Sequence, residues 1–386
     1  MKTARLRRCC ILLWLTMPAW LPVAVGAADI TEVPIGIAMP LTGPAAAFGK
    51  SLVNAAEMAI DDANRRHPKV AGRAVRFKLL VVDERGSTRT AALAANYLIK
   101  QGVVASIGNG STFTTLATAR IFSDAGIAQL APSASAPWPE GERHTTFRMI
   151  GHSGQGAPLL ADYLVDNLHA LNAAVIDNGT RAGNMFGAAF KERFQARKGK
   201  VVSSDSIQFR SSDFNTILEA TRLKRPDVIF FGGLADQAAA LVRNVRRVGL
   251  QTTFVHGMNG TNGLNFLRDA GAAADGVLAI NPGMPTDKMP GWKNFEKEYL
   301  QRFGGNINDY APITYDAVQV LVAAVRDADS FLPARILAAL YKVRYSGLTG
   351  TISFDRNGNL LNPIFTIYQM KDMHWLPLQT YDASKS

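Results

Sequence analysis

Residues 106–137 read SIGNGSTFTTLATARIFSDAGIAQLAPSASAP and contain the pattern from which the fold follows. Two short apolar runs, at 104–107 and 127–130, each lead directly into small hydroxyl-bearing residues. A segment with helical periodicity, 113–125, separates the two runs. Strand, polar loop, helix and strand in this order predict a βαβ unit within a parallel α/β sheet.

The hydroxyl-bearing residues follow the two predicted strands at their carboxyl ends. In open parallel α/β sheets, ligands bind in the crevice outside these ends. The helix expected to begin near Phe113 adds backbone N–H groups and the positive end of a dipole, which suit a carboxylate. In the alternative interpretation, the hydroxyls only cap the helix and form turns. They are Ser111, Thr112, Thr114 and Thr115 after the first strand, and Ser133 and Ser135 after the second.

The first 28 residues differ from the rest of the chain. Basic residues at 2, 5, 7 and 8 precede an apolar run, 9–25, which ends in the small residues Val-Gly-Ala-Ala. This order predicts a cleaved secretory signal peptide, residues 1–28, and the run is short for a membrane-spanning helix. Both cysteines, Cys9 and Cys10, lie in this segment, so the mature chain would have no disulfide. Export of a cysteine-free chain favours the bacterial periplasm.

Composition excludes several classes of function. The 386 residues carry a formal net charge of +11, but the basic residues are scattered and form no block with interleaved aromatics. We therefore expect no nucleic-acid partner. The six histidines show no metal-ligand spacing, so we expect no metal and no cofactor.

Strand-like runs alternate with helical segments from Val33 to about residue 280, which predicts parallel sheets covered on both faces. There are too many strands for one sheet, and seams at 137–146 and 277–282 divide them. We therefore predict two α/β lobes, with the chain crossing between them more than once. The lobes are expected to comprise residues 29–149 with 282–355, and residues 150–281 with 356–386.

Several short motifs occur in an order typical of one family. They are Pro40-Leu-Thr-Gly43-Pro44, Asn54-Ala-Ala-Glu57-Met-Ala-Ile-Asp61, Val82-Asp83, Ile107-Gly108, Ala131-Pro-Ser-Ala-Ser135, Gln155-Gly156, Phe231-Gly232-Gly233 and Thr314-Tyr-Asp-Ala317. In these the chain resembles the periplasmic solute-binding proteins of the leucine/isoleucine/valine-binding type, over nearly all of the mature sequence. The resemblance implies a type I periplasmic binding fold: two similar lobes joined by three crossovers, with the ligand held between them. It also implies a soluble monomer that delivers its ligand to an ABC permease in the inner membrane.

The resemblance also implies which residues bind the ligand. The hydroxyls that grip the ligand fall on Thr112 and Ser135, with the backbone of Ser133 beside them. The apolar walls fall on Phe48 and Tyr310, for which ordinary packing is the alternative. Hydroxyls with backbone N–H groups suit a carboxylate, and such walls bury a side chain.

One loop departs from the family pattern. Amino-acid binders place an acidic residue against the ligand's ammonium in the loop that here reads HGMNG, residues 256–260, which has no Asp or Glu. Asp236 is a candidate replacement, or only a helix cap. Groups near Asp236 and Asn259 are expected to complete the closed cleft, with Leu234 and Ala182 as less secure wall positions. Leucine is therefore doubtful as the ligand, and carboxylates without an ammonium, aromatic acids, amides and ureas are candidates.

Enzyme signatures are incomplete. The segment Gly151-His-Ser153-Gly-Gln155 has Gln where a nucleophile elbow needs its second glycine, and the glycine-rich run at 108–113 ends in Phe. Together with the family resemblance, which implies a component of an ABC importer, this predicts a non-enzymatic protein that closes around a small carboxylate or amino-acid-like solute. The alternatives are a sensory module of a membrane receptor or regulator and, from another class, a hydrolase using Ser153.

Overall fold

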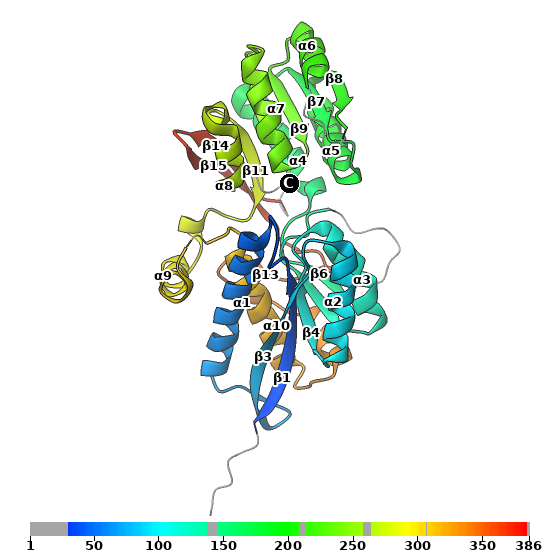
Figure 1. Ribbon diagram of the computed structural model, residues 1–386, viewed down its shortest axis with the longest axis vertical. Helices are drawn as coiled ribbons and strands as arrows, with labels where there is room; N and C mark the ends of the chain where they lie inside the picture. Colours follow the sequence, from blue (N-terminus) through cyan, green and yellow to red (C-terminus); the bar gives the residue numbers. More distant parts are fainter. Residues whose placement is uncertain (1–29, 137–144, 209–213, 258–263, 306, 384–386) are drawn as a thin grey trace, which may run out of the picture.

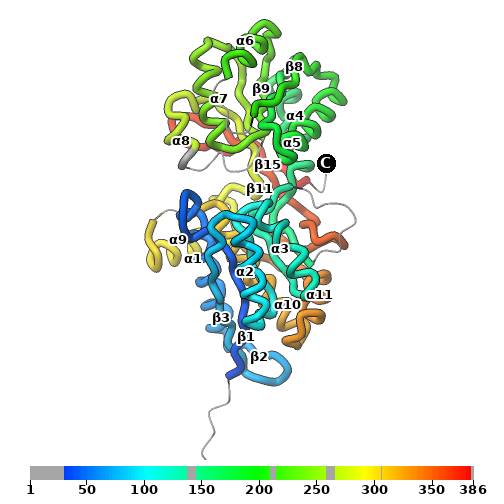
Figure 2. The backbone as a smooth tube through the Cα atoms, turned by 45° about the vertical axis from the view of Figure 1, so that its right-hand side comes forward, coloured from blue at the N-terminus to red at the C-terminus, as the bar shows by residue number. Residues whose placement is uncertain are grey.

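The computed structural model describes residues 30–136, 145–208, 214–257, 264–305 and 307–383. Asn259 and the predicted signal peptide lie outside these ranges. The chain forms two lobes stacked along the long axis of the molecule, each built around its own sheet (Figure 1). A view turned by 45° shows the same separation (Figure 2). The predicted α/β architecture of two lobes is confirmed.

The first lobe contains a six-stranded sheet with the order β2-β3-β1-β4-β5-β6. All neighbouring pairs are parallel except the short edge pair β2 and β3. The strands are β1 (Thr31–Met39), β2 (Lys69–Val70), β3 (Arg73–Asp83), β4 (Ala105–Gly108), β5 (Ala128–Ala131) and β6 (Thr146–Arg148). The helices are α1 (Ala46–Arg65), α2 (Thr88–Lys100), α3 (Thr112–Asp124), α9 (Trp292–Phe303), α10 (Ala311–Asp327) and α11 (Pro333–Leu340).

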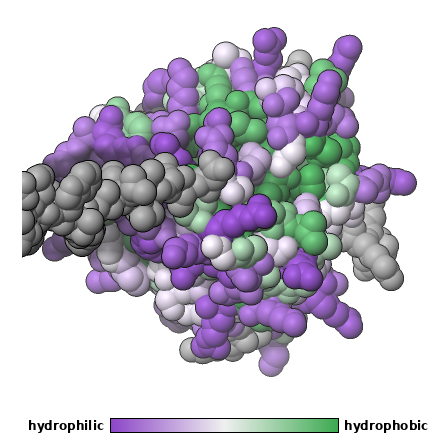
Figure 3. Space-filling model, turned by 90° about the horizontal axis from the view of Figure 1, so that it is seen from below, coloured by the Kyte–Doolittle hydropathy of each residue, from purple (hydrophilic) through white to green (hydrophobic). Residues whose placement is uncertain are grey.

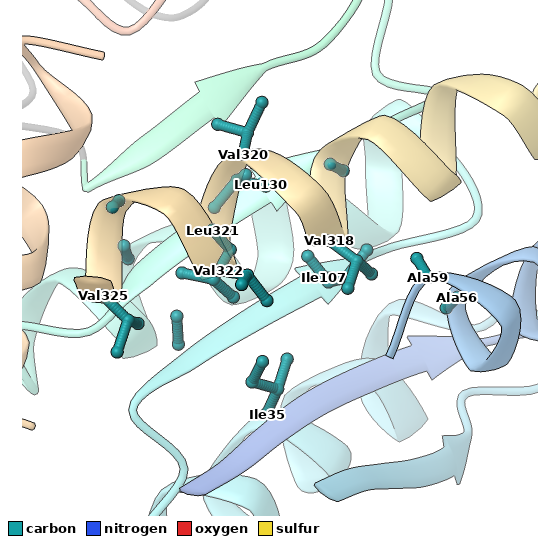
Figure 4. Packing of buried hydrophobic residues seen from close by; sticks show 14 of the residues in the cluster. Ile35, Ala56, Ala59, Ile107, Leu130, Val318, Val320, Leu321, Val322 and Val325 are labelled. Carbon is teal, nitrogen blue, oxygen red and sulfur yellow. The ribbon is translucent and has the colours of Figure 1, made fainter. Parts of the chain in front are cut away.

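The core of the first lobe lies between its sheet and the helix α10. This helix is apolar around most of its circumference, and 13 of its 17 residues are buried. Its valines and leucine lie over Ile35, Ile107 and Leu130 of the sheet, with α1 alongside (Figure 4). The opposite face of the sheet is covered by α2 and α3, which pack around Leu98 and Phe122. Both faces are therefore buried, as continuous apolar strands require.

The second lobe contains a seven-stranded sheet with the order β15-β14-β11-β10-β9-β7-β8. Phenylalanine-rich cores fill both of its faces, one with α4 and α5 and the other with α6, α7 and α8. The strands are β7 (Asn172–Asp177), β8 (Lys200–Ser206), β9 (Val228–Gly232), β10 (Thr253–His256), β11 (Leu278–Pro282), β14 (Ile364–Lys371) and β15 (His374–Asp382). The helices are α4 (Ser153–Leu168), α5 (Arg181–Ala196), α6 (Asn215–Lys224), α7 (Ala235–Arg247) and α8 (Leu264–Ala270).

The chain passes between the lobes at three places in the sequence. It leaves β6 for α4, leaves β11 for the 3-10 turn η2 (Thr286–Lys288) and α9, and returns through the hairpin of β12 (Tyr345–Gly347) and β13 (Gly350–Ile352) to β14. The expected residue boundaries of the lobes stay a prediction. Seen from the outer end of the first lobe, hydrophilic side chains surround a more hydrophobic area (Figure 3).

A few elements differ from expectation. The strand β15 and the helix α8 were not predicted, and α4 begins at Ser153 instead of near residue 156. β15 contains Pro377, which removes a donor but is tolerated because the strand lies at the sheet edge. Within the described residues, none of the helices is both long and apolar enough to cross a bilayer.

Candidate ligand-binding site

The loops at the carboxyl ends of the strands meet at the hinge. Two of the crossings leave from the carboxyl ends of β6 and β11, and the neighbouring strands β5 and β10 run parallel to them. The carboxyl ends of both sheets therefore lie on the hinge side. This is where ligands bind in open α/β sheets.

Thr112 connects the two hydroxyl-bearing loops of the first lobe. It is the first residue of α3, and its Oγ1 accepts hydrogen bonds from the backbone N–H of Ser135 at 3.0 Å and of Ala136 at 3.4 Å. The carbonyl of Ser135 in turn accepts from the N–H of Ser153, on the crossover, at 2.9 Å. The sequence placed Thr112 and Ser135 in one site, and the structure brings them into contact.

The other hydroxyls of the first cluster serve the helix. Ser111 and Thr114 form a capping box, in which each side-chain oxygen accepts from the other residue's N–H at 3.2 Å. The Thr115 hydroxyl donates to the carbonyl of Ser111 at 2.8 Å. These three residues therefore cap the helix and form its first turn, as in the alternative interpretation.

The two serines of the second loop have different roles. Ser133 Oγ donates to the carbonyl of Asn109 at 2.9 Å, so this hydroxyl joins the two loops. Ser135 is half-buried, and its hydroxyl makes no hydrogen bond within the part of the chain that the structure describes. Ser135 Oγ is therefore the serine hydroxyl that can donate to a ligand.

A buried carboxyl group, missed by the sequence reasoning, lies beneath these loops. Glu84 follows β3 and is fully buried, and it accepts hydrogen bonds from the Asn109 side chain, the Gly110 N–H at 2.9 Å and the Thr114 hydroxyl at 3.1 Å. Burial raises the pKa of Glu84, while these three hydrogen bonds act in the opposite direction. Its only signal in the sequence was its place at the end of a predicted strand, directly after the Val82-Asp83 motif.

A buried guanidinium group lies beneath the second loop. Arg148, the last residue of β6, is fully buried and donates to the carbonyl oxygens of Ala134 and, at 2.6 Å, of Ala136. Burial lowers the pKa of Arg148 to about 9, partly opposed by the charge of Asp355. The group is still charged at neutral pH, and it turns the carbonyls of the loop inward while the N–H groups of Ser135 and Ala136 face Thr112.

The two predicted wall residues lie against each other. The rings of Phe48, near the start of α1, and Tyr310, just before α10, are 5.9 Å apart at an interplanar angle of 73°. Both side chains are half-buried and pack against the core of the first lobe. Packing therefore accounts for part of their role, and each keeps a surface exposed at the hinge side.

The second lobe offers fewer groups than expected. Asp236 lies exposed in the first turn of α7, where its Oδ1 accepts from the N–H of Gln237 at 2.8 Å. The carboxylate is thus engaged within the first turn of the helix, although the N-cap residue is Leu234. Gln237 in turn accepts from the Asn178 side chain at 2.9 Å, and His256 bonds the Gly233 carbonyl at 2.7 Å. In the described ranges, no group of three His, Cys, Asp or Glu side chains is arranged to hold a metal.

Comparison with known proteins identifies the family. The model of the family described as periplasmic binding protein matches residues 32–374. The chain therefore belongs to this family. Members of this family are substrate-binding proteins rather than enzymes, and they act in the periplasm or outside the cell together with a permease.

Three similar proteins illustrate the family. This periplasmic binding protein is 26% identical over 356 residues to the Leu/Ile/Val-binding protein homolog 3 of Brucella melitensis, covering 91% of this chain and 94% of that one. The leucine-binding protein of Thermotoga maritima superposes with a TM-score of 0.81 at 23% identity, over 92% and 100% of the two chains. An ABC-transporter solute-binding protein of Rhodopseudomonas palustris, solved with 3,4-dihydroxybenzoic acid, has a TM-score of 0.74 at 21% identity, over 91% and 98%.

Proposed function

We propose that this chain is the periplasmic substrate-binding component of an ABC importer and that it holds a small carboxylate between its lobes. In this proposal the mature chain begins near Asp29, after a cleaved signal peptide, and acts as a monomer without catalysis. The observation that carries the proposal is the contact of Thr112 Oγ1 with the N–H groups of Ser135 and Ala136.

The first lobe suits an anion because two of its hydroxyl groups have protons that are free to donate to a ligand. A threonine hydroxyl has two acceptor lone pairs and one proton, and both backbone N–H groups point at the acceptor side of Thr112. Its proton is then available to a ligand, as is the hydroxyl of Ser135. The amino end of α3 and the buried charge of Arg148 add positive potential from two sides.

The second lobe argues against an α-amino acid. An ammonium removed from water needs a counter-charge, and the HGMNG segment supplies none while Asp236 bonds within its own helix. The relatives described above are named for leucine, isoleucine and valine or were solved with 3,4-dihydroxybenzoic acid, and all four compounds share one group, a carboxylate. We therefore expect a carboxylate without an α-ammonium to be the preferred ligand.

The lobes close when one ligand contacts both of them. A ligand shifts the equilibrium toward the closed form only through the difference in its affinity for the two forms. Contacts to Thr112 in one lobe and to groups of the second lobe supply that difference. The closed form is the one that would dock on the permease.

The test is a binding screen of refolded, ligand-free mature chain against amino acids, aliphatic and aromatic acids, amides and ureas, by thermal shift and calorimetry. A cognate ligand at a hundred times its dissociation constant stabilises the folded state by about 2.7 kcal/mol. We expect Thr112→Val with Ser135→Ala to weaken the best carboxylate at least tenfold, because both hydroxyl donors are lost.

The matched control is Thr253→Val, at the amino end of β10, the end of the second sheet away from the hinge. It should leave the affinity unchanged. Unaltered carboxylate affinity in the double variant would remove Thr112 and Ser135 from the proposed role, and a preference for leucine would show that an ammonium partner exists.

A further inference from the structure

A cavity of about 330 Å³ lies at the hinge, bounded by both lobes. Its walls in the second lobe include Asn281, Tyr368 and Trp375, and its walls in the first lobe include Tyr310 and Ile313. Because the Tyr310 ring also packs edge-on against Phe48, the cavity shares a wall with the predicted ligand cleft. Tyr310 is therefore the residue that joins the cavity to the predicted wall of the cleft.

The cavity contains buried polar atoms without partners. Asn281, near the end of β11, is only 6% exposed, yet neither its Nδ2 nor its Oδ1 makes a hydrogen bond among the described residues. The indole Nε1 of Trp375 on β15 is also buried and unpartnered there. Such groups are rare in folded proteins because water or another partner normally satisfies them. Two of the seven described residues that carry such atoms, Asn281 and Trp375, line this one cavity.

The chemistry of the occupant follows from these atoms. The carboxamide of Asn281 carries a carbonyl acceptor and an NH2 group with two donor protons, so it can pair with another amide through two reciprocal hydrogen bonds, and the indole adds a further donor. Asp287 and Asp309 also line the cavity, and among the described residues that line it none is basic. Burial, with the charges of both aspartates, raises the pKa of Tyr368 to about 12. The potential here is negative, which disfavours a second carboxylate.

We infer that the hinge cavity is the subsite for the far end of the solute and that it takes a neutral carboxamide or ureido group. This inference rests on the proposed function, in which Thr112 and Ser135 hold the carboxylate at the near end. The preferred solute then has a carboxylate at one end and an amide or urea at the other. Because the cavity includes walls from both lobes, its occupant favours the arrangement of the lobes in which these walls meet.

The first experiment compares probes of equal length that differ only at the far end. These are 4-carbamoylbenzoate with terephthalate, and 4-carbamoylbutanoate with glutarate, measured by calorimetry on the mature chain. We expect at least one amide acid to bind tenfold or more tightly than its diacid. Asn281→Leu should bring the two affinities within about twofold, since leucine has a similar volume but no polar atoms.

The matched control for that variant is Asn172→Leu, at the amino end of β7 and thus at the opposite end of the second sheet. It should leave the preference for the amide unchanged. Asn281→Asp serves as a second variant, because it keeps the side-chain shape while adding a negative charge. Asn281→Asp should lower the affinity for the diacid more than the affinity for the amide acid, and so widen the difference between them.

A second measurement locates the probe directly. The indole N–H resonance of Trp375, assigned through Trp375→Phe, should shift when the amide acid binds, while that of Trp292 on α9 should not. Absence of this shift, absence of binding by both amide acids, or a preference that survives in Asn281→Leu each overturns the inference. An equal effect of Asn281→Leu on all probes indicates a cavity filled by water only, which also overturns it.

A different set of results would contradict the proposed function and not the far-end subsite. If the Thr112 and Ser135 variants leave simple benzoate or butanoate binding intact, the near-end site is wrong. If they abolish it while Asn281→Leu leaves the amide preference intact, only the far-end subsite is wrong.

Discussion

Arg148 is the residue on which the geometry of the second loop depends most. Its guanidinium satisfies two carbonyl oxygens of a buried loop, and both would be left without donors in its absence. Hydrogen bonds to charged groups are stronger than neutral ones, and unpaired buried groups are unfavourable. In the proposed function, the charge of Arg148 would therefore act on a bound carboxylate through the loop that it holds.

We predict that Arg148→Met lowers the free energy of unfolding by about 3 kcal/mol and weakens carboxylate binding at least tenfold. Urea denaturation and calorimetry measure the two effects. Arg148→Lys keeps the charge and should retain more affinity than Arg148→Met, which separates the charge from the loss of stability. Arg120→Met is the control, since this side chain on α3 is 85% exposed and paired only with Asp124 at 3.7 Å. Equal affinities in Arg148→Met and wild type would contradict this role.

Neither Arg148 nor Glu84 was predicted as part of the site. A single buried charge has no periodicity or spacing by which sequence reasoning detects it, because its partners come from distant loops. The hydroxyl clusters that contain Thr112 and Ser135 were predicted because each cluster follows a strand in the same βαβ unit, and the family resemblance selected these two residues within them. Their shared sheet edge is a local consequence of the fold class.

At the scale of single elements, the start of α3 is set by its cap. Ser111 and Ser87 are both serines that precede a helix, but only Ser111 accepts a hydrogen bond from its helix, while Ser87 makes no side-chain cap. The cap made by Ser111 holds the first turn of α3, which begins with Thr112, in place. The two serines therefore form a natural pair for a test.

We predict that Ser111→Ala lowers the free energy of unfolding by about 1 kcal/mol and that Ser87→Ala changes it by less than half as much. Both values come from urea denaturation curves. Ser111→Ala should also weaken carboxylate binding several-fold, because the first turn of α3 holds Thr112. If both serines matter equally, the capping box does not determine the order of this turn.

At the scale of the whole molecule, stability should depend on pH through a buried histidine. His256 is fully buried, and burial lowers its pKa to about 4 from 6.5, although its bond to the Gly233 carbonyl opposes the shift. Between pH 6.5 and 4 the unfolded chain therefore binds a proton that the folded chain does not. The stability contributed by the neutral imidazole is complete above pH 6.5 and is lost as the pH falls through this window.

We predict that wild type loses about 3 kcal/mol more than His256→Gln between pH 6.5 and 4, at about 1.4 kcal/mol per unit of pKa. Asp316, whose pKa burial raises to about 6, acts in the opposite direction, so the comparison with His256→Gln isolates the histidine. Urea denaturation at several pH values measures the difference, and an imidazole NMR titration gives the pKa directly. Parallel pH profiles for the two proteins would contradict the assignment.

The sequence by itself determined the fold class, the order of most elements and the meeting of the two hydroxyl clusters that contain Thr112 and Ser135. These features depend on apolar periodicity and on residues a few positions from a strand end, which are local in the chain. Only the tertiary structure decided that Ser111 and Thr115 serve the helix, that Ser133 bonds Asn109, and that Arg148 lies beneath the loop.

The hinge cavity was beyond sequence reasoning for the same physical reason. Asn281, Tyr310 and Trp375 are separated by up to 94 positions and meet only because three crossings bring both sheets to one hinge. The unpartnered state of an amide is a property of its surroundings, not of its neighbours in sequence. Burial and partnership are decided by packing between distant segments, and so the chemistry of the far end of the ligand is visible only in the folded chain.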